Sequence, residues 1–221
     1  MQQIKKYKLI VFDWDGTLMD SISKIVQCMQ SAAKKMALPI PSEEEVRKVI
    51  GYSLQEAVIR VFPECDSKQL DHIASHYRFF YQDAGLFPQS LFSGAESLLQ
   101  DLKDQGYLLA VATGKARSGL NKVLSDTKLA HYFTITRCAD ETKSKPHPQM
   151  LNEILQALSI LPHQALMVGD SEMDLIMANN ANLDSVGVSY GAHTSDMLSH
   201  AKPKLIIDSL NELKNFLLFY K

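Results

Sequence analysis

The chain has 221 residues, of which 46% are hydrophobic and 22% charged, and its formal net charge is −2. This charge argues against a general nucleic-acid or polyanion binder, and no apolar run approaches the roughly 20 residues of a membrane span. The length fits one α/β domain with an insertion, or two small domains. The cysteines lie at unrelated spacings without a metal or redox pattern, which favours reduced thiols in the cytoplasm.

The first predicted strand, residues 8–13, ends in two carboxylates. Its apolar run leads into Asp13-Trp14-Asp15-Gly16-Thr17, and Gly16 breaks the strand. Residues two apart on an extended strand share a face, which would bring the side chains of Asp13 and Asp15 together. Two such anions repel each other unless a cation lies between them or one is protonated. The motif therefore indicates either a divalent cation beside a carboxylate nucleophile or an ordinary turn rich in Asp and Gly.

Residues 19–88 show helical periodicity and almost no strand signal. One apolar stripe starts at Ile22 and a second runs from Leu70 to Tyr81. Ser42 and Ser53 are each followed three residues later by Glu, the pattern of a capping box at a helix start. We expect a helical module inserted after the first strand.

From about residue 88 onward, apolar strands alternate with helices, which predicts a parallel sheet with crossover helices. Ser93 and Glu96 form a further capping-box pattern, ahead of a helix that ends at Gly106. The remaining predicted strands are residues 108–113, 133–138, 165–169, 184–189 and 204–208.

Polar residues follow two of these strands, and a third polar motif lies between them. The strand at 108–113 ends in Thr113-Gly114-Lys115, and the strand at 165–169 is followed by Asp170 and, four residues later, Asp174. Between them comes Ser144-Lys145-Pro146. Ligands in open α/β sheets bind at the carboxyl ends of the strands, so these side chains are candidates for one site.

With these four motifs in this order, the chain resembles the haloacid dehalogenase-like hydrolase superfamily, subclass I, and most closely its phosphoglycolate phosphatase-like branch. The resemblance implies an α/β fold: a Rossmann-like doubly wound parallel sheet core with an inserted helical cap domain. It places the catalytic core in residues 1–18 and 89–221 and the helical cap in residues 19–88. A cap over the carboxylates would exclude water and select the substrate by closing.

The resemblance also implies roles for the motif residues. Asp13 would be the nucleophile, and Asp15 the general acid and base for the leaving group and the attacking water. Because members that release halide generally lack the second Asp, its presence favours phosphate chemistry. Thr113, Gly114 and Lys145 would bind the phosphate. Lys145 is preferred to Lys143 because Pro146 follows it. Lys115 could contact the phosphate or be exposed.

The implied cofactor is Mg²⁺, which prefers hard oxygen ligands. Its ligands would be Asp13, the backbone carbonyl of Asp15, and Asp170. Asp174 would be a further ligand or would support the others.

The leading hypothesis is a Mg²⁺-dependent phosphatase that hydrolyses a small phosphomonoester through an aspartyl-phosphate intermediate. The alternatives are a phosphomutase of the β-phosphoglucomutase type, a phosphonatase that uses a cap lysine, and a non-catalytic binding module. The expected partner is a small phosphorylated metabolite, with neither nucleic acid nor a membrane, and the chain is expected to be a monomer or homodimer. Thr113-Gly114-Lys115 departs from the Thr-Asn-Lys of the branch, so the substrate stays open. The candidate cap cations for binding it are Arg47, Lys48, Arg60 and Arg78.

Overall fold

A computed structural model describes residues 6–82 and 86–218; the predicted core and cap ranges therefore extend into residues 1–5, 83–85 and 219–221, which lie outside the described residues. Across the described residues the main sheet is six-stranded and parallel, in the order β5-β4-β1-β6-β7-β8. Each predicted strand is confirmed to within two residues at either end; the four inner strands are mostly buried, whereas the two outer strands are partly exposed. The strands are β1 (Leu9–Phe12), β4 (Leu108–Thr113), β5 (Ile135–Cys138), β6 (Ala165–Gly169), β7 (Asp184–Val188) and β8 (Leu205–Ile207).

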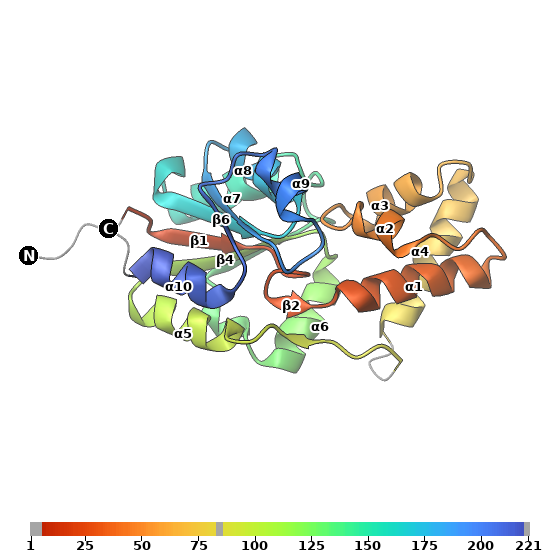
Figure 1. Ribbon diagram of the computed structural model, residues 1–221, viewed down its shortest axis with the longest axis horizontal. Helices are drawn as coiled ribbons and strands as arrows, with labels where there is room; N and C mark the ends of the chain where they lie inside the picture. Colours follow the sequence, from red (N-terminus) through yellow and green to blue (C-terminus); the bar gives the residue numbers. More distant parts are fainter. Residues whose placement is uncertain (1–5, 83–85, 219–221) are drawn as a thin grey trace, which may run out of the picture.

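Helices cover both faces of the sheet, which confirms the Rossmann-like α/β fold (Figure 1). Alternate residues of β1 point to opposite faces: Ile10 and Phe12 pack in one hydrophobic cluster, and Leu9 and Val11 in the other. The first cluster includes residues of α5 (Ala95–Asp104), α6 (Arg117–Thr127) and α10 (Leu210–Leu218). The second includes residues of α7 (Gln149–Leu158) and α8 (Glu172–Asn180); the short α9 (Ser195–Ser199) packs beside α8.

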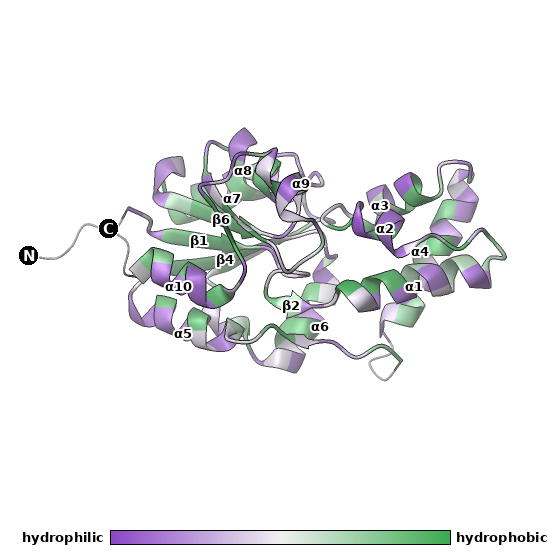
Figure 2. Cartoon of the chain, viewed as in Figure 1, coloured by the Kyte–Doolittle hydropathy of each residue, from purple (hydrophilic) through white to green (hydrophobic). Residues whose placement is uncertain are grey.

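Among the described residues, four helices are inserted between the short strands β2 (Met19–Asp20) and β3 (Ser90–Leu91), and we call them the helical insert. They lie together beyond one end of the sheet (Figure 1). The insert has its own buried cluster, which includes Met29 and Ile73, and its apolar residues turn inward (Figure 2). Its helices are α1 (Ile22–Lys35), α2 (Glu43–Arg47), α3 (Leu54–Val61) and α4 (Ser67–Gln82).

Two predicted helix starts have different outcomes. The capping box of Ser42 with Glu45 is confirmed at the start of α2. The capping box at Ser93 is wrong: α5 starts after Gly94, which has a left-handed φ of 82° and no side-chain cap. None of the helices formed by the described residues is both long and apolar enough to cross a membrane.

Candidate active site

Three neighbouring strands bring the predicted site residues to one edge of the sheet. Asp13 follows β1, Thr113 ends β4, and Asp170 follows β6. Because β1 lies between β4 and β6 and all three are parallel, their carboxyl ends meet. All three side chains are buried, with at most 3% of their surface exposed.

Lys145 joins two of the predicted acidic residues. Its Nζ donates to Asp13 Oδ1 at 2.6 Å and to Asp174 Oδ1 at 2.5 Å. The other oxygen of Asp174 accepts from the backbone N–H and the hydroxyl of Ser171 at the start of α8. Helix α8 therefore fixes Asp174, and Asp174 in turn fixes the lysine beside Asp13. Lys143, by contrast, is exposed.

Asp170 is held by the loops that surround it. Its Oδ1 accepts from the Thr17 hydroxyl at 3.2 Å, and its Oδ2 accepts from the backbone N–H of Ala192 at 2.7 Å. A Cβ at Gly16 or at Gly191 would collide with the Asp170 side chain. Glycine is needed at both positions because the backbone must approach the carboxylate this closely.

The acidic residues form a buried cluster suited to a cation. Carboxylate oxygens of Asp13, Asp170 and Asp174 all lie within 4.8 Å of one another. Burial raises the pKa of Asp13 to about 7, although the charge of Lys145 lowers it. Burial and the neighbouring carboxylates raise the pKa of Asp170 well above its usual range. Burial favours a lower pKa for Lys145, but the charges of Asp13 and Asp174 prevail and raise it.

These groups fit Mg²⁺. The Lys145 ammonium pairs with Asp13 and Asp174 but not with Asp170, so a divalent cation would relieve the remaining repulsion among the three carboxylates. All of the donor atoms are hard oxygens, which Mg²⁺ prefers.

The side chain of Asp15 does not belong to the acidic cluster and contacts Ser21 and Lys115 instead. Its Oδ1 accepts from the Ser21 hydroxyl at 2.6 Å, and its Oδ2 lies 2.8 Å from Lys115 Nζ. Lys115 is thus neither exposed nor simply a phosphate contact: its side chain is 9% exposed and ion-paired with Asp15. The Thr-Gly-Lys motif marks the position of Lys115, but it does not predict this partner.

Lys115 also connects the sheet to the helical insert. Its Nζ donates to the hydroxyl of Tyr81 on α4 at 2.8 Å, and Tyr81 donates to Gln89 Oε1 at 3.0 Å. Burial and the negative charge of Asp15 raise the pKa of Tyr81 well above its usual range, so the phenol stays protonated. A chain of contacts therefore runs from Asp15 through Lys115 to α4.

The phosphate-binding candidates of β4 lie directly beneath the insert. The Thr113 hydroxyl accepts from the backbone N–H of Lys115 at 3.2 Å, which leaves its own hydrogen free to donate. A Cβ at Gly114 would lie 2.5 Å from the carbonyl oxygen of Tyr52. The backbone N–H of Ser53 donates to the Ser144 hydroxyl at 2.9 Å. The loop between α2 and α3 therefore packs closely onto the carboxyl end of the sheet.

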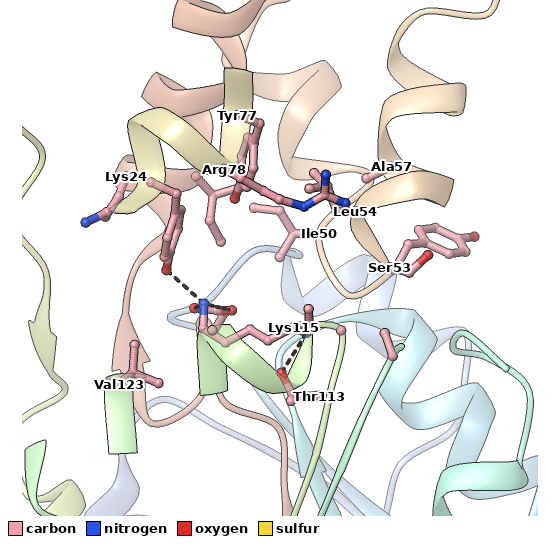
Figure 3. A pocket seen from close by; sticks show the side chains of 18 of the residues that line it. Lys24, Ile50, Ser53, Leu54, Ala57, Tyr77, Arg78, Thr113, Lys115 and Val123 are labelled. Carbon is pink, nitrogen blue, oxygen red and sulfur yellow. Dashed lines mark hydrogen bonds and ion pairs between the residues drawn. The ribbon is translucent and has the colours of Figure 1, made fainter. Parts of the chain in front are cut away.

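A cavity of about 530 Å³ lies between the sheet and the insert. Thr113 and Lys115 lie on its lower side, while Ile50, Tyr77 and Arg78 lie above them (Figure 3). Asp13 and Asp15 also line the cavity, so both of the predicted catalytic carboxylates face the same space.

Comparisons with known proteins agree with this geometry. Residues 10–188 match the haloacid dehalogenase-like hydrolase family. A probable phosphatase of Dickeya dadantii, IndB, is 34% identical over 211 residues, which cover 93% of this chain and 91% of that protein. A phosphoglycolate phosphatase of Vibrio cholerae is 32% identical over 219 residues, which cover 95% of this chain and 96% of that protein.

A solved structure has a similar overall fold. The crystal structure of a predicted phosphoglycolate phosphatase from Haemophilus somnus has a TM-score of 0.86 at 28% identity. The likeness covers 97% of this chain and 99% of that one. Because the family match spans most of the sequence and these proteins match it nearly end to end, the chain belongs to the haloacid dehalogenase-like hydrolase family, in its phosphoglycolate phosphatase-like branch.

Proposed function

We propose that the chain is a Mg²⁺-dependent phosphatase that hydrolyses a small phosphomonoester through an aspartyl-phosphate on Asp13. The observation that carries this proposal is the setting of Asp13. Its carboxylate lines the cavity, accepts from the buried Lys145, and lies within 4.8 Å of two further acidic side chains. The phosphatase relatives support the same reaction class.

In the first step, a carboxylate oxygen of Asp13 attacks phosphorus and the bond from phosphorus to the leaving-group oxygen breaks. Asp15 gives that oxygen a proton. In the second step, water attacks phosphorus, Asp15 takes its proton, and the bond between Asp13 and phosphorus breaks. Inorganic phosphate leaves, and both aspartates return to their starting forms.

The surrounding residues stabilise the charge that the phosphoryl group carries. The Thr113 hydroxyl, the backbone N–H of Gly114 and the Lys145 ammonium are the proposed phosphate donors. Asp13, Asp170 and the backbone carbonyl of Asp15 would hold Mg²⁺, with Asp174 as a further ligand or as their support. When bound, the ion supplies Lewis-acid neutralisation of phosphate charge.

We assign residues 19–88 as a cap and residues 1–18 with 89–221 as the catalytic core. The contacts of the helical insert with Gly114 and Ser144 support this division. We place the enzyme in the cytoplasm, which the unpaired thiols of Cys28, Cys65 and Cys138 favour. A monomer or homodimer remains our prediction for its assembly.

The test is phosphate release with Mg²⁺ across a panel of phosphoglycolate, sugar phosphates, nucleoside monophosphates and pyrophosphate. We expect turnover that EDTA stops and that Asp13→Asn abolishes, while circular dichroism shows the variant folded. Retained turnover in folded Asp13→Asn would remove Asp13 as the nucleophile. Weak hydrolysis with a persistent phospho-enzyme would instead favour the phosphomutase, and a sugar bisphosphate would then be tried as activator.

A further inference from the structure

The cations that line the cavity differ in whether they have partners. Lys115 is paired with Asp15. Lys122 lies 2.9 Å from Asp126, and Lys24 Nζ lies 4.8 Å from the centroid of the Tyr81 ring. Arg78 on α4 differs: across the described residues, it has no ion pair, hydrogen bond or ring contact. Its guanidinium therefore has its hydrogen-bonding capacity available to a ligand.

Arg78 lies on the opposite side of the cavity from the phosphate-binding residues. Its side chain extends from α4 toward Leu54 on α3, above Ile50, whereas Thr113 and Lys115 lie below (Figure 3). The wall on the insert side contains apolar side chains, among them Ile25, Met29 and Ile50, as well as the uncharged polar side chains of Ser53, Gln55 and Gln82. The cavity thus has the Arg78 guanidinium on one side and the phosphate-binding residues on the other, with the apolar Ile50 between them.

The other candidate cations of the insert are already engaged. Arg47 donates to backbone carbonyls of the loop after β7, and Lys48 pairs with Glu44 at 2.6 Å. The Arg60 guanidinium lies 4.2 Å from the ring centroid of Tyr52 and 3.4 Å from Glu56. None of these three lines the cavity, whereas Arg78 does.

We propose that Arg78 is a specificity-determining residue, and that it binds an anionic group at the far end of the leaving group. The inference rests on the proposed phosphatase function and names its substrate class: a phosphomonoester with an apolar spacer and a second anion, carboxylate or phosphate. A guanidinium suits either anion because its fork of N–H groups matches two oxygens at once. The cavity volume of about 530 Å³ is within the range of small-molecule sites, and the two-carbon glycolate group would fill only part of it.

The experiment compares matched phosphoesters that differ only at the far end of an alkyl chain. One series ends in carboxylate, one in phosphate and one in a neutral hydroxyl, each at several chain lengths. The measured quantity is the ratio of kcat/KM for an anionic ester to kcat/KM for the neutral ester of the same length. Since Arg78 is exposed to solvent, we expect a preference of about fivefold, the upper end for an exposed ion pair.

Arg78→Gln should reduce the ratio to near one, and Arg78→Lys should retain part of the preference. Arg78→Glu should instead favour an ester that ends in an ammonium group. Arg60→Gln is the matched control, since this insert cation does not line the cavity, and it should keep the wild-type ratio. The carboxylate and phosphate series show which anion is preferred.

The outcomes separate this inference from the phosphatase proposal. If wild type hydrolyses every ester with a ratio near one, the enzyme is a phosphatase and the role of Arg78 is wrong. A preference that persists unchanged in folded Arg78→Gln would also overturn it. If wild type hydrolyses no phosphoester, the proposed function fails, and this inference fails with it.

Discussion

Lys115 connects Asp15, the proposed general acid and base, to Tyr81 of the helical insert. Its ammonium contacts both oxygens of Asp15, Oδ2 at 2.8 Å and Oδ1 at 3.0 Å, and the Ser21 hydroxyl also donates to Oδ1, so the carboxylate has a fixed orientation. Tyr81 fixes the lysine from the side of the insert. A carboxylate that must give and take a proton at one atom benefits from such restraint, since small misplacements are costly in catalysis.

Replacing Lys115 tests this role. We expect Lys115→Met to lower kcat about tenfold or more, because Asp15 loses its positioning partner and acid–base catalysis contributes about 10²–10⁴. KM should change less, and Lys115→Arg should recover part of kcat. Steady-state kinetics on the best substrate of the panel measures both constants.

The exposed Lys143 provides the control for Lys115. Lys143→Met should behave as wild type, since its side chain contacts neither carboxylate. A Lys115→Met enzyme with unchanged kcat would show that Ser21 alone is enough to position Asp15.

At this scale, the sequence is informative about motif residues and uninformative about their partners. Asp13, Thr113 and Asp170 could be placed in one site because each ends a buried strand. The pairing of Lys115 with Asp15 joins residues far apart in the chain, and their ion pair depends on how β1 and β4 are aligned. No local pattern encodes that distance.

Among the elements, α4 contributes both to the core of the insert and to the lining of the cavity. Its inner side packs Ile73 and Ala74 into the core of the insert, and it supplies Tyr81 and Arg78 to the cavity. It packs chiefly against α1, which follows β2. The position of the two cavity residues therefore depends on the packing of this helix pair.

The packing prediction concerns Ile73, which is fully buried. Ile73→Ala should lower the free energy of unfolding by about 2–5 kcal/mol, because it removes buried methyl groups and leaves a cavity. Urea unfolding followed by circular dichroism measures the change. Ile59→Ala on α3 makes the same chemical change at a side chain that is 51% exposed, so its effect should stay within about 0.5 kcal/mol. Equal losses in both variants would contradict the packing assigned to α4.

The elements themselves were largely predictable, because strands of a buried parallel sheet are short, nearly continuous apolar runs. The start of α5 was not. Ser93 and Glu96 match the capping-box spacing, yet the backbone turns through Gly94 in a left-handed conformation and the helix begins one residue later. At Ser53 only half of the predicted capping box forms. Its hydroxyl caps α3, but its backbone N–H donates to the Ser144 hydroxyl instead of to the Glu56 side chain. In both places, tertiary contacts and backbone geometry override the local pattern.

At the scale of the whole molecule, Arg47 connects the helical insert to the loop that follows β7. Its guanidinium donates to the carbonyl oxygens of Gly191 at 2.6 Å and of Ala192 at 3.3 Å. The backbone N–H of Ala192 in turn donates to Asp170. The insert thus contacts the same loop that orients one of the proposed metal ligands.

Loss of this contact should favour an open insert. We expect Arg47→Met to raise KM by about threefold to tenfold with a smaller fall in kcat, since binding is weakened when the competent state is less populated. Lys48→Met is the matched control at the neighbouring position, because the ion pair that Lys48 forms among the described residues is with Glu44. Steady-state kinetics distinguishes the two, and an unchanged KM in Arg47→Met would mean that other contacts keep the insert in place.

The pairing of β2 with β3 has a consequence for how such enzymes diversify. Met19 pairs with Leu91 and Asp20 with Ser90, so the chain leaves for the insert and returns from it at adjacent points. The segment between those points can therefore change in length without moving a strand of the main sheet, as long as Ser21 and Tyr81 keep their contacts with Asp15 and Lys115. New substrates can therefore be acquired through the insert, while the residues at the strand ends keep the phosphate chemistry that they share.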